Sequence, residues 1–569
     1  MLRIFFLIIS LTLPLLSQTT ETYFRISTAE ASLETLIDRC SLDEAQDGFY
    51  YGYANDAEWQ WLTEHFSSVE KQLHPGSRYD HQMSSSYADL SNNWDTFPTY
   101  DAYVATMQQY EIDFPQLCQL DTFGVSTQGR LLLAMKITDN PTAAEDEPEF
   151  LYTSTMHGDE TTGYPLSIRL IDYLLNGYGS EGEQGERITK LVNNLEIWIN
   201  PLANPDGTYR NGNNSVNGAW RRNANGVDLN RDFPDRIVDP NNTTQGREQE
   251  TAEMMQFVAA HNFTLSANFH GGAQVVNYPW DNGALSGSYS ACPDDAWFID
   301  VSRVYATPNQ DIMNGGFSNG ITNGCQWYAI NGGRQDWIYV WHGGRETTIE
   351  LWNTKNPPGS VLPERWEQNR ESFLVYMEET WKGIRGRVKD ITTLQPLAAE
   401  INVIGYPDVP VFSDAEVGNF HRLLLPGSYD LAVSAPGYIS DTLYAISVSD
   451  TGATRINWSL YPLLVGTGDT PANTSIPQTA VLFQNYPNPF NPNTTIRFSL
   501  PASGEVRIAA YTPLGEMVTV ISQENRQAGA HQVSWDGFDA YGNSVASGVY
   551  FYRLEMAGQV LSRKMILLR

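Results

Sequence analysis

A histidine and a glutamate three residues apart, His157 and Glu160, stand directly after an apolar stretch of strand length. Just beyond a strand, this spacing lets an imidazole nitrogen and a carboxylate oxygen turn toward one point, and Zn²⁺ accepts both as ligands. The motif alone is weak, because solvated turns often contain it. A third candidate ligand, His270, ends the apolar run 263–269 and precedes two glycines. Together the three residues predict a zinc site with one position left open for water.

Cationic and amide side chains stand close together in a second segment. Arg221 and Arg222 follow a tryptophan, and Asn230 and Arg231 come a few residues later. A guanidinium presents two parallel donors that match a carboxylate. Because isolated arginines are more often ordinary surface cations, this segment predicts a carboxylate-binding site only in company with the metal ligands.

Glu350 interrupts the apolar end of the strand-like segment 346–352. A carboxylate in such a place is costly unless it has a partner or a task. Burial raises the pKa of a carboxyl group, which suits a general base near neutral pH. Taken alone, a paired structural glutamate is the simpler interpretation.

The candidate residues fall where the hydrophobic pattern predicts that elements end. From about residue 100 to 382, apolar runs of strand length alternate with helical patterns, which favours an α/β domain with a largely covered sheet. Open sheets of this class bind ligands where their strands end. We expect strands at 150–156, 195–199, 263–269 and 347–352, and helices at 165–175, 248–261 and 363–381.

Other units flank this domain. Residues 19–80 mix strand-like segments with helical patterns at 29–40 and 56–73, which predicts a small α+β unit, and a polar stretch at 75–91 is typical of a linker. Residues 383–462 and 479–569 have short alternating segments between turns, which predict two small all-β sandwiches. The Thr-, Pro- and Gly-rich stretch 463–478 is expected to link them.

Charge and the first residues limit the partners. The 569 residues include 35 Lys and Arg against 66 Asp and Glu, a net charge of −31. Such a surface repels nucleic acid and anionic membranes. Arg3, the apolar run 4–16 and Ser17 predict a secretory signal peptide over 1–18. No later apolar run is long enough for a membrane helix, so we expect an exported protein with no integral membrane segment in the mature chain.

The chain has four cysteines, Cys40, Cys118, Cys292 and Cys325, which an exported protein can oxidise. Four cysteines allow three full pairings, and the sequence does not choose among them. A Cys292–Cys325 bridge and buried free thiols are equally open alternatives.

Taken together, the motifs resemble the zinc carboxypeptidases of the carboxypeptidase A/B superfamily, and within it the N/E/D branch. The resemblance covers about 100–382, and it implies a catalytic domain over 86–382 with a mixed sheet covered by helices. The blocks that carry it are 157–160 (HGDE), 204–207 (NPDG), 228–231 (DLNR), 268–272 (NFHGG), 277–279 (NYP), 320–324 (GITNG) and 366–370 (WEQNR).

The resemblance implies a catalytic role for matching residues. His157, Glu160 and His270 would bind one Zn²⁺, and Glu350 would be the general base and acid. Arg221, directly after the tryptophan, would polarise the scissile carbonyl, with the next arginine as second candidate. Water activated at the zinc would then hydrolyse the C-terminal peptide bond.

It also implies how the substrate, a peptide or protein C-terminus, is recognised. Asn230 and Arg231 would hold the terminal carboxylate, and Tyr328 would close over the substrate. Asp281 matches an acidic specificity position of the branch, and Gln335 matches the base of the side-chain pocket. Because a buried carboxylate favours a cationic guest, we expect release of C-terminal Lys or Arg. A solvated loop position for Asp281 is the alternative.

The flanking units resemble known modules more loosely. Residues 19–80 are similar to the pro-segments of secreted carboxypeptidases, and 383–462 to a transthyretin-like β-sandwich. The segments 485–492 (NYPNPFNP) and 548–554 (GVYFYRL) make 479–569 resemble a type IX secretion sorting domain. That implies a bacterial protein, secreted or held at the cell surface, whose last domain meets the secretion machinery. A plain immunoglobulin-like adhesion module is the alternative.

The sequence departs from the family pattern at two positions, since Asp159 and Asp232 stand where asparagine is common. An additional carboxylate beside the metal predicts a shifted pH optimum. Two other functions stay open: a zinc amidase that acts on cell-wall peptides, and a catalytically silent surface-binding protein.

Overall fold

The computed structural model describes residues 20–37, 39–92, 94–283, 285–406, 409–463, 480–485 and 488–568. The expected signal peptide and nearly all of the expected linker lie outside the described residues. The chain divides into two compact units. One contains residues up to Pro436 together with Thr442–Tyr461, and the other contains Gly437–Asp441 together with the residues from Pro462 onward.

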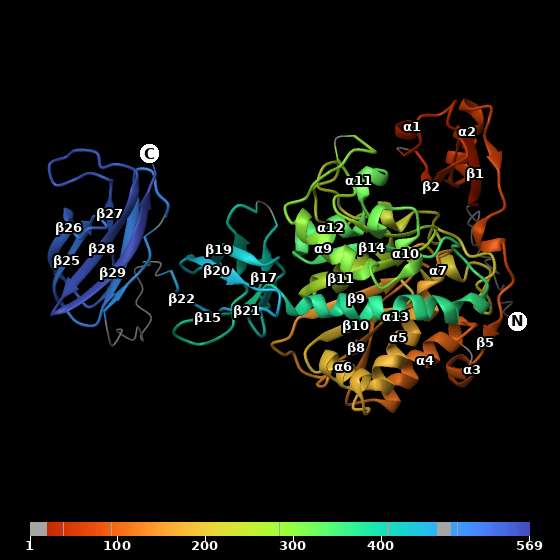
Figure 1. Ribbon diagram of the computed structural model, residues 1–569, viewed down its shortest axis with the longest axis horizontal. Helices are drawn as coiled ribbons and strands as arrows, with labels where there is room; N and C mark the ends of the chain where they lie inside the picture. Colours follow the sequence, from red (N-terminus) through yellow and green to blue (C-terminus); the bar gives the residue numbers. More distant parts are fainter. Residues whose placement is uncertain are drawn as a thin grey trace, which may run out of the picture. The chain divides into compact units, whose positions relative to one another are not determined.

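An eight-stranded mixed sheet forms the centre of the first unit (Figure 1). Four central strands, β10, β9, β11 and β14, pair in parallel, and antiparallel strands join them on both sides. Parallel strands are normally buried on both faces, and every residue of β10, β11 and β14 is buried. In spatial order the strands are β13 (Ile321–Asn323), β12 (Gln274–Tyr278), β14 (Arg345–Leu351), β11 (Phe263–His270), β9 (Glu149–Ser154), β10 (Glu196–Asn200), β8 (Leu131–Ile137) and β7 (Cys118–Val125).

Helices cover both faces of this sheet, as the alternation of patterns predicts. Side chains of β9 alternate between two core clusters: Phe150 and Tyr152 pack with α4, α5, α9 and α13, whereas Leu151 packs with α8 and α12. The period of two in a strand produces this division. These helices are α4 (Tyr100–Asp113), α5 (Gly163–Gly177), α8 (Gln249–Ala259), α9 (Asp295–Ala306), α12 (Arg334–His342) and α13 (Leu362–Glu378).

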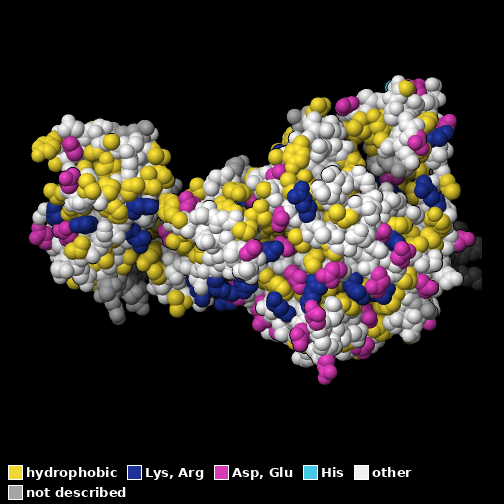
Figure 2. Space-filling view, in the orientation of Figure 1, with side chains coloured by type: hydrophobic (Ala, Val, Ile, Leu, Met, Phe, Trp, Pro, Cys, Tyr) yellow, Lys and Arg dark blue, Asp and Glu magenta, His cyan; other side chains and the backbone are white. Residues whose placement is uncertain are grey.

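Short elements complete the domain and carry several polar residues of the site. The clamp candidates, that is Asn230 and Arg231 as the residues expected to hold a carboxylate, lie on the 3₁₀ turn η2 (Leu229–Arg231). The others are η1 (Pro75–Ser77), β5 (Met83–Ser84), α3 (Tyr87–Asn92), β6 (Phe97–Pro98), α6 (Glu183–Val192), α7 (Pro205–Thr208), α10 (Gln310–Met313), η3 (Ser318–Gly320), α11 (Gly324–Trp327), η4 (Gly359–Val361) and η5 (Glu379–Trp381). Figure 2 shows acidic side chains interspersed with basic ones on the visible face of this domain.

The N-terminal residues form a small α+β unit on a four-stranded sheet of order β2-β3-β1-β4. Its apolar side chains, such as Phe24, Leu36 and Leu62, make a core cluster of their own. Its elements are β1 (Thr22–Ser27), α1 (Leu33–Ile37), β2 (Ser41–Gln46), β3 (Phe49–Ala54), α2 (Asp56–His65) and β4 (Glu70–Lys71).

Two sequence expectations for this region are wrong in detail. The helix expected over 56–73 ends at His65, because Phe66 is extended and the chain returns as β4 to pair with β1. The stretch expected as a linker over 75–91 is structured, since β5 pairs with β6 and α3 follows it. Short polar segments carry no periodicity, so their pairing partners decide their structure.

Two all-β regions follow the α/β domain. The first consists of β15 (Ile384–Asp390), β16 (Glu400–Val403), β17 (Val411–Phe412), β18 (Asn419–Arg422), β19 (Gly427–Ser434), β20 (Asp441–Val448), β21 (Thr454–Arg455) and β22 (Trp458–Leu460). The second packs a three-stranded and a four-stranded sheet around one apolar core. Its strands are β23 (Val481–Leu482), β24 (Thr494–Leu500), β25 (Gly504–Tyr511), β26 (Met517–Arg526), β27 (Gly529–Trp535), β28 (Gly548–Met556) and β29 (Gln559–Leu567).

All four cysteines are buried free thiols. Burial raises the pKa of Cys40 and Cys118 to about 12, so these thiols are unreactive near neutral pH. Of the two alternatives that the sequence left open, this structure has the free thiols.

Candidate active site

Two neighbouring strands bring the three expected metal ligands together. His157 and Glu160 lie on the turn between β9 and α5, and His270 is the last residue of β11. β9 and β11 pair in parallel, so their carboxyl ends meet at one edge of the sheet. This topology joins two histidines that are 113 residues apart in sequence.

The ligand atoms of these residues form a nearly equilateral triangle. Glu160 Oε2 lies 3.0 Å from His157 Nδ1 and 2.9 Å from His270 Nδ1, and the two nitrogens are 3.1 Å apart. Atoms with this spacing can all lie about 2.0–2.2 Å from one ion, the usual range for zinc ligands. All three side chains are buried. The donor set therefore fits a zinc ion.

The charges of these three residues, called the triad below, suit a metal as well. Burial lowers the pKa of His270 to about 4, so its imidazole is neutral at neutral pH. Burial alone would raise the pKa of Glu160, but the neighbouring His157 and the Lys355 ammonium hold it well below its usual range. A neutral imidazole and an ionised carboxylate are the forms that bind metal.

Asp228 holds one histidine of the triad and one neighbouring arginine in place, a role that sequence reasoning did not assign. Its Oδ1 lies 3.0 Å from His157 Nε2, and its Oδ2 accepts a hydrogen bond from Arg221 Nε at 3.0 Å. A carboxylate on the second ring nitrogen fixes the orientation and tautomer of a metal-binding histidine. The only signal in the sequence is that Asp228 begins the block 228–231.

The two adjacent arginines have different surroundings. Arg221 Nη1 lies 3.2 Å from Glu160 Oε1 and 3.0 Å from His157 Nδ1. Arg222 instead pairs with Glu58 of the N-terminal unit at 2.7 Å. Arg221 is therefore the arginine that faces the triad.

Glu350 lies opposite His270, because β14 pairs in parallel with β11 in that register. Its side chain is buried, and among the described residues its Oε2 has no hydrogen-bond partner. Burial and the nearby charge of Glu160 raise the pKa of Glu350 well above its usual range. A buried carboxylate oxygen without a partner is costly, which points to a group that has a task in the cleft.

Both clamp candidates, Asn230 and Arg231, line the cleft. Arg231 lines the cleft and donates to the Asn230 carbonyl at 2.8 Å, and in the described part of the chain no carboxylate forms an ion pair with it. Asn230 is held by its side-chain oxygen, which accepts the Arg334 N–H at 3.0 Å. This arrangement can accept a carboxylate.

Asp281 lines the same cleft and is in contact with Gln335. Asp281 Oδ1 accepts hydrogen bonds from Gln335 Nε2 at 2.6 Å and Asn277 Nδ2 at 3.1 Å. The Asp281 N–H donates to the carboxylate of Asp336. Burial raises the pKa of Asp281 to about 7, so a cation that binds here would also ionise its partner.

Nine of the ten site residues expected from the sequence line one cleft of about 530 Å³, and Gln335 is the tenth. Tyr328 is among them, directly after α11. Residues 103–372 match the family model described as zinc carboxypeptidase. The carboxypeptidase N catalytic chain of Mus musculus is 34% identical over 395 residues, which cover 63% of this chain and 85% of that protein. This chain belongs to the zinc carboxypeptidase family.

Other relatives of this carboxypeptidase family cover the same part of the chain. Carboxypeptidase SOL1 of Arabidopsis thaliana is 35% identical over 351 residues, or 61% of this chain and 69% of that protein. Carboxypeptidase D of Homo sapiens is 36% identical over 377 residues, which are 64% of this chain but 26% of the relative. The chain thus spans about a quarter of the length of carboxypeptidase D. Separately, residues 491–559 match the model of the FlgD Ig-like domain.

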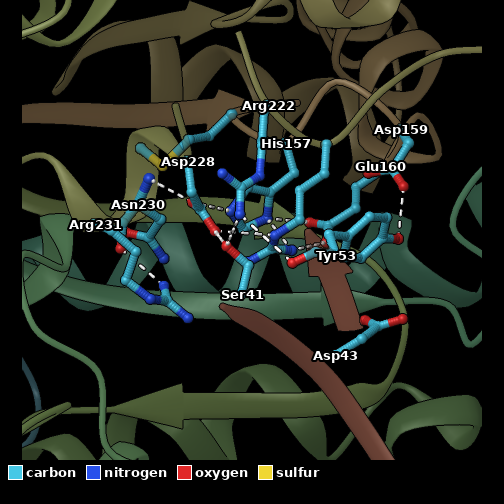
Figure 3. Close-up of polar contacts among 12 residues, drawn as sticks. Ser41, Asp43, Tyr53, His157, Asp159, Glu160, Arg222, Asp228, Asn230 and Arg231 are labelled. Atoms are coloured by element: carbon cyan, nitrogen blue, oxygen red, sulfur yellow. Dashed lines mark hydrogen bonds and ion pairs between the residues drawn. The ribbon is translucent and has the colours of Figure 1, made fainter. Parts of the chain in front are cut away.

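The N-terminal unit reaches into this carboxypeptidase cleft, which sequence reasoning did not locate. Ser41 Oγ donates to Asp228 at 2.7 Å, and Tyr53 Oη donates to Asp159 at 2.7 Å. Asp43 forms an ion pair with Lys355 at 2.7 Å and lines the cleft itself. Figure 3 shows these three side chains beside the metal-ligand residues. Long-range contacts of this kind leave no periodic trace in a sequence.

Proposed function

We propose that this chain hydrolyses the C-terminal peptide bond of peptides or proteins as a zinc metallocarboxypeptidase. One observation carries the proposal: the triad lines the same cleft as the Arg231 guanidinium, which has no ion-pair partner among the described residues. The triad fits a hydrolytic metal, and the guanidinium fits a free terminal carboxylate. An internal peptide bond would leave Arg231 without a partner, which explains why only a chain end reacts.

The side chains of the cleft divide the chemistry among them. Asn230 and Arg231 hold the terminal carboxylate and so place the last peptide bond at the triad. A zinc ion held by His157, Glu160 and His270 would lower the pKa of a bound water to about 7 and polarise a carbonyl. Glu350, on the neighbouring strand, accepts the proton of the attacking water and returns it to the leaving amine.

Arg221 is placed to stabilise the negative charge that develops on the carbonyl oxygen. Its Nη1 already contacts the triad, and its Nε is held by Asp228. A donor fixed in advance costs no reorganisation during the reaction, and removing one such donor typically lowers the rate by about 10²–10³-fold.

Asp281 supports a preference for C-terminal Lys or Arg. Its carboxylate is a buried part of the cleft lining and accepts a hydrogen bond from Gln335. A cationic side chain would gain a buried ion pair, whereas a neutral one would leave the carboxylate unpaired.

We also propose that the N-terminal unit is a pro-segment that covers the cleft until it is displaced. Ser41, Asp43 and Tyr53 occupy polar groups of the cleft that a substrate would otherwise meet. Export by a signal peptide, and sorting through the last domain of a bacterial protein, remain proposals that rest on the sequence motifs. Among the described residues, no helix is both long and apolar enough to span a bilayer.

The experiment is release of free amino acids from matched peptides that end in Arg, Lys, Leu or Phe. It compares protein freed of residues 19–80 with the same protein carrying Glu350→Gln, with and without a chelator. We expect chelator-sensitive release of Arg and Lys that Glu350→Gln abolishes. Release of Leu or Phe alone would refute the pocket assignment. Hydrolysis of a muropeptide, with no hydrolysis of these peptides, would favour the amidase. If the protein showed neither activity and bound no zinc, a silent binding protein would be favoured.

A further inference from the structure

Lys355 is a buried cation in the cleft that the mechanism above does not use. Its Nζ lies 2.8 Å from Glu160 Oε1 and 2.7 Å from Asp43 Oδ1. The side chain is only 5% exposed. An ammonium group this deeply buried requires carboxylate partners, and one of its two partners belongs to the N-terminal unit rather than to the catalytic domain.

The chain makes room for this lysine at the wall of the cleft. Gly272, directly after the second metal-ligand histidine and its neighbour Gly271, has φ +121°. A Cβ at position 272 would lie 2.8 Å from Lys355 Cε and 3.5 Å from Asp43 Oδ1. Any side chain larger than hydrogen would therefore displace the lysine or its partner.

Asp43 reaches the lysine from an irregular point of its strand. The register of β2 on β3 shifts between Leu42 and Glu44, which leaves Asp43 as the residue without an opposite partner. Bulges of this kind redirect a side chain. Tyr23 Oη also donates to Asp43 Oδ2 at 3.0 Å and helps to hold it there.

The position of Asp43 in the cleft identifies what it replaces. Figure 3 shows Arg231 beside Asn230, with Asp43 well away from both, and all three line the cleft. If Arg231 holds the terminal carboxylate and the triad holds the scissile carbonyl, the substrate residue on the other side of that bond faces Lys355.

We propose that Lys355 is a specificity-determining residue that selects peptides with Asp or Glu directly before the C-terminal residue that is removed. This inference rests on the proposed carboxypeptidase function and extends it to the acyl side of the bond. Asp43 stands in for the substrate carboxylate in the covered state. When the N-terminal unit leaves, Lys355 loses one of its two carboxylates and can accept another from the substrate.

The test measures binding to the full chain carrying Glu350→Gln, which prevents turnover, and Asp43→Asn, which frees the lysine. Calorimetry in zinc-containing buffer compares two acetylated tetrapeptides, Ala-Ala-Asp-Arg and Ala-Ala-Asn-Arg. They have the same shape and differ in one charge. We expect the aspartate peptide to bind about tenfold more tightly, the effect of one charge-assisted hydrogen bond.

Two further variants separate recognition from support of Glu160. In Lys355→Met the ratio of the two affinities should fall to about one, whereas Lys355→Arg should keep the aspartate peptide ahead. Damage to the metal site weakens both peptides alike and leaves the ratio unchanged. Equal affinities before the lysine is changed, a ratio that survives Lys355→Met, or no binding of either peptide would each overturn the inference.

The outcome is distinguishable from failure of the proposed function. Release of Arg by the Asp43→Asn chain with Glu350 intact tests that function separately. Release without a difference between the peptides would keep the carboxypeptidase and discard the role of Lys355. A clear affinity ratio without any release would keep the recognition of the acidic residue by Lys355 and discard the carboxypeptidase activity.

Discussion

Replacing Asp281 by asparagine should remove the preference for basic C-terminal residues while leaving the rest of the cleft in place. The asparagine oxygen can still accept from Gln335 and Asn277, and its backbone N–H can still donate to Asp336. Only the negative charge is lost. The substitution therefore tests the charge rather than the packing of the pocket.

The magnitude follows from the burial of the carboxylate, which is only 3% exposed. Leaving a buried cation without its partner typically costs about 3–5 kcal/mol. That corresponds to a loss of roughly 10²–10⁴-fold in kcat/KM for a peptide ending in Arg. A peptide ending in Leu makes no such pair, so its kcat/KM should stay within a few-fold or rise.

The pH dependence supplies a second, independent test. The pKa of Asp281 is raised to about 7 by burial, so the free enzyme carries the charge in about a tenth of molecules at pH 6 and about nine tenths at pH 8. The preference for Arg should thus increase with pH, since the ionised form is the one that attracts the cation. The ratio of kcat/KM for Arg over Leu peptides should rise about tenfold between these pH values, because titration of groups common to both substrates cancels.

The assay is this ratio, measured from pH 5.5 to 8.5 for the unchanged chain and for Asp281→Asn. Asp232→Asn is a matched control, because Asp232 is a partly buried carboxylate whose Oδ2 accepts the Glu248 N–H instead. The variant should show a low, flat ratio, and the control should follow the unchanged chain. If Asp281→Asn kept the preference for Arg, or if its ratio still rose with pH, the assignment of Asp281 would be refuted.

Three further predictions concern the N-terminal unit, the metal site and a buried histidine. Tyr53→Phe, which removes the hydrogen bond to Asp159, should loosen the N-terminal unit and increase the initial rate of the full chain several-fold; an unchanged rate would contradict the covering role. Zn²⁺ added to chelator-treated protein should raise the Tm by several degrees through selective binding to the folded state, and His270→Ala should abolish that rise; equal rises in both proteins would place the metal elsewhere. Burial lowers the pKa of His421 to about 3 in the folded protein, below the ordinary value near 6.5. The stability that the neutral, buried imidazole allows is therefore complete above pH 6.5 and is lost as pH falls toward 3. Between pH 7 and pH 5 this amounts to about 2 kcal/mol, and His421→Gln should lose correspondingly less stability in urea unfolding at pH 5; equal losses would show that His421 is not buried in neutral form.

Much of the catalytic domain was accessible from local patterns. The strand expected at 263–269 is β11, and the helix expected at 165–175 lies within α5. Such long apolar elements are determined by their own periodicity and burial, which neighbours in sequence already specify. The short elements after His65 escaped prediction because two-residue strands exist only through their partners.

The sequence by itself determined which chemistry this protein can perform. The ligand, base and clamp residues are side chains of defined donor type, and their identity does not depend on the fold. Tertiary structure alone decided which residues support them: that Asp228 holds His157, and that Asp43 reaches Lys355. These contacts join residues far apart in the chain, and no local pattern encodes them. They arise only when parallel strands align their ends and a separately folded N-terminal unit packs against that edge.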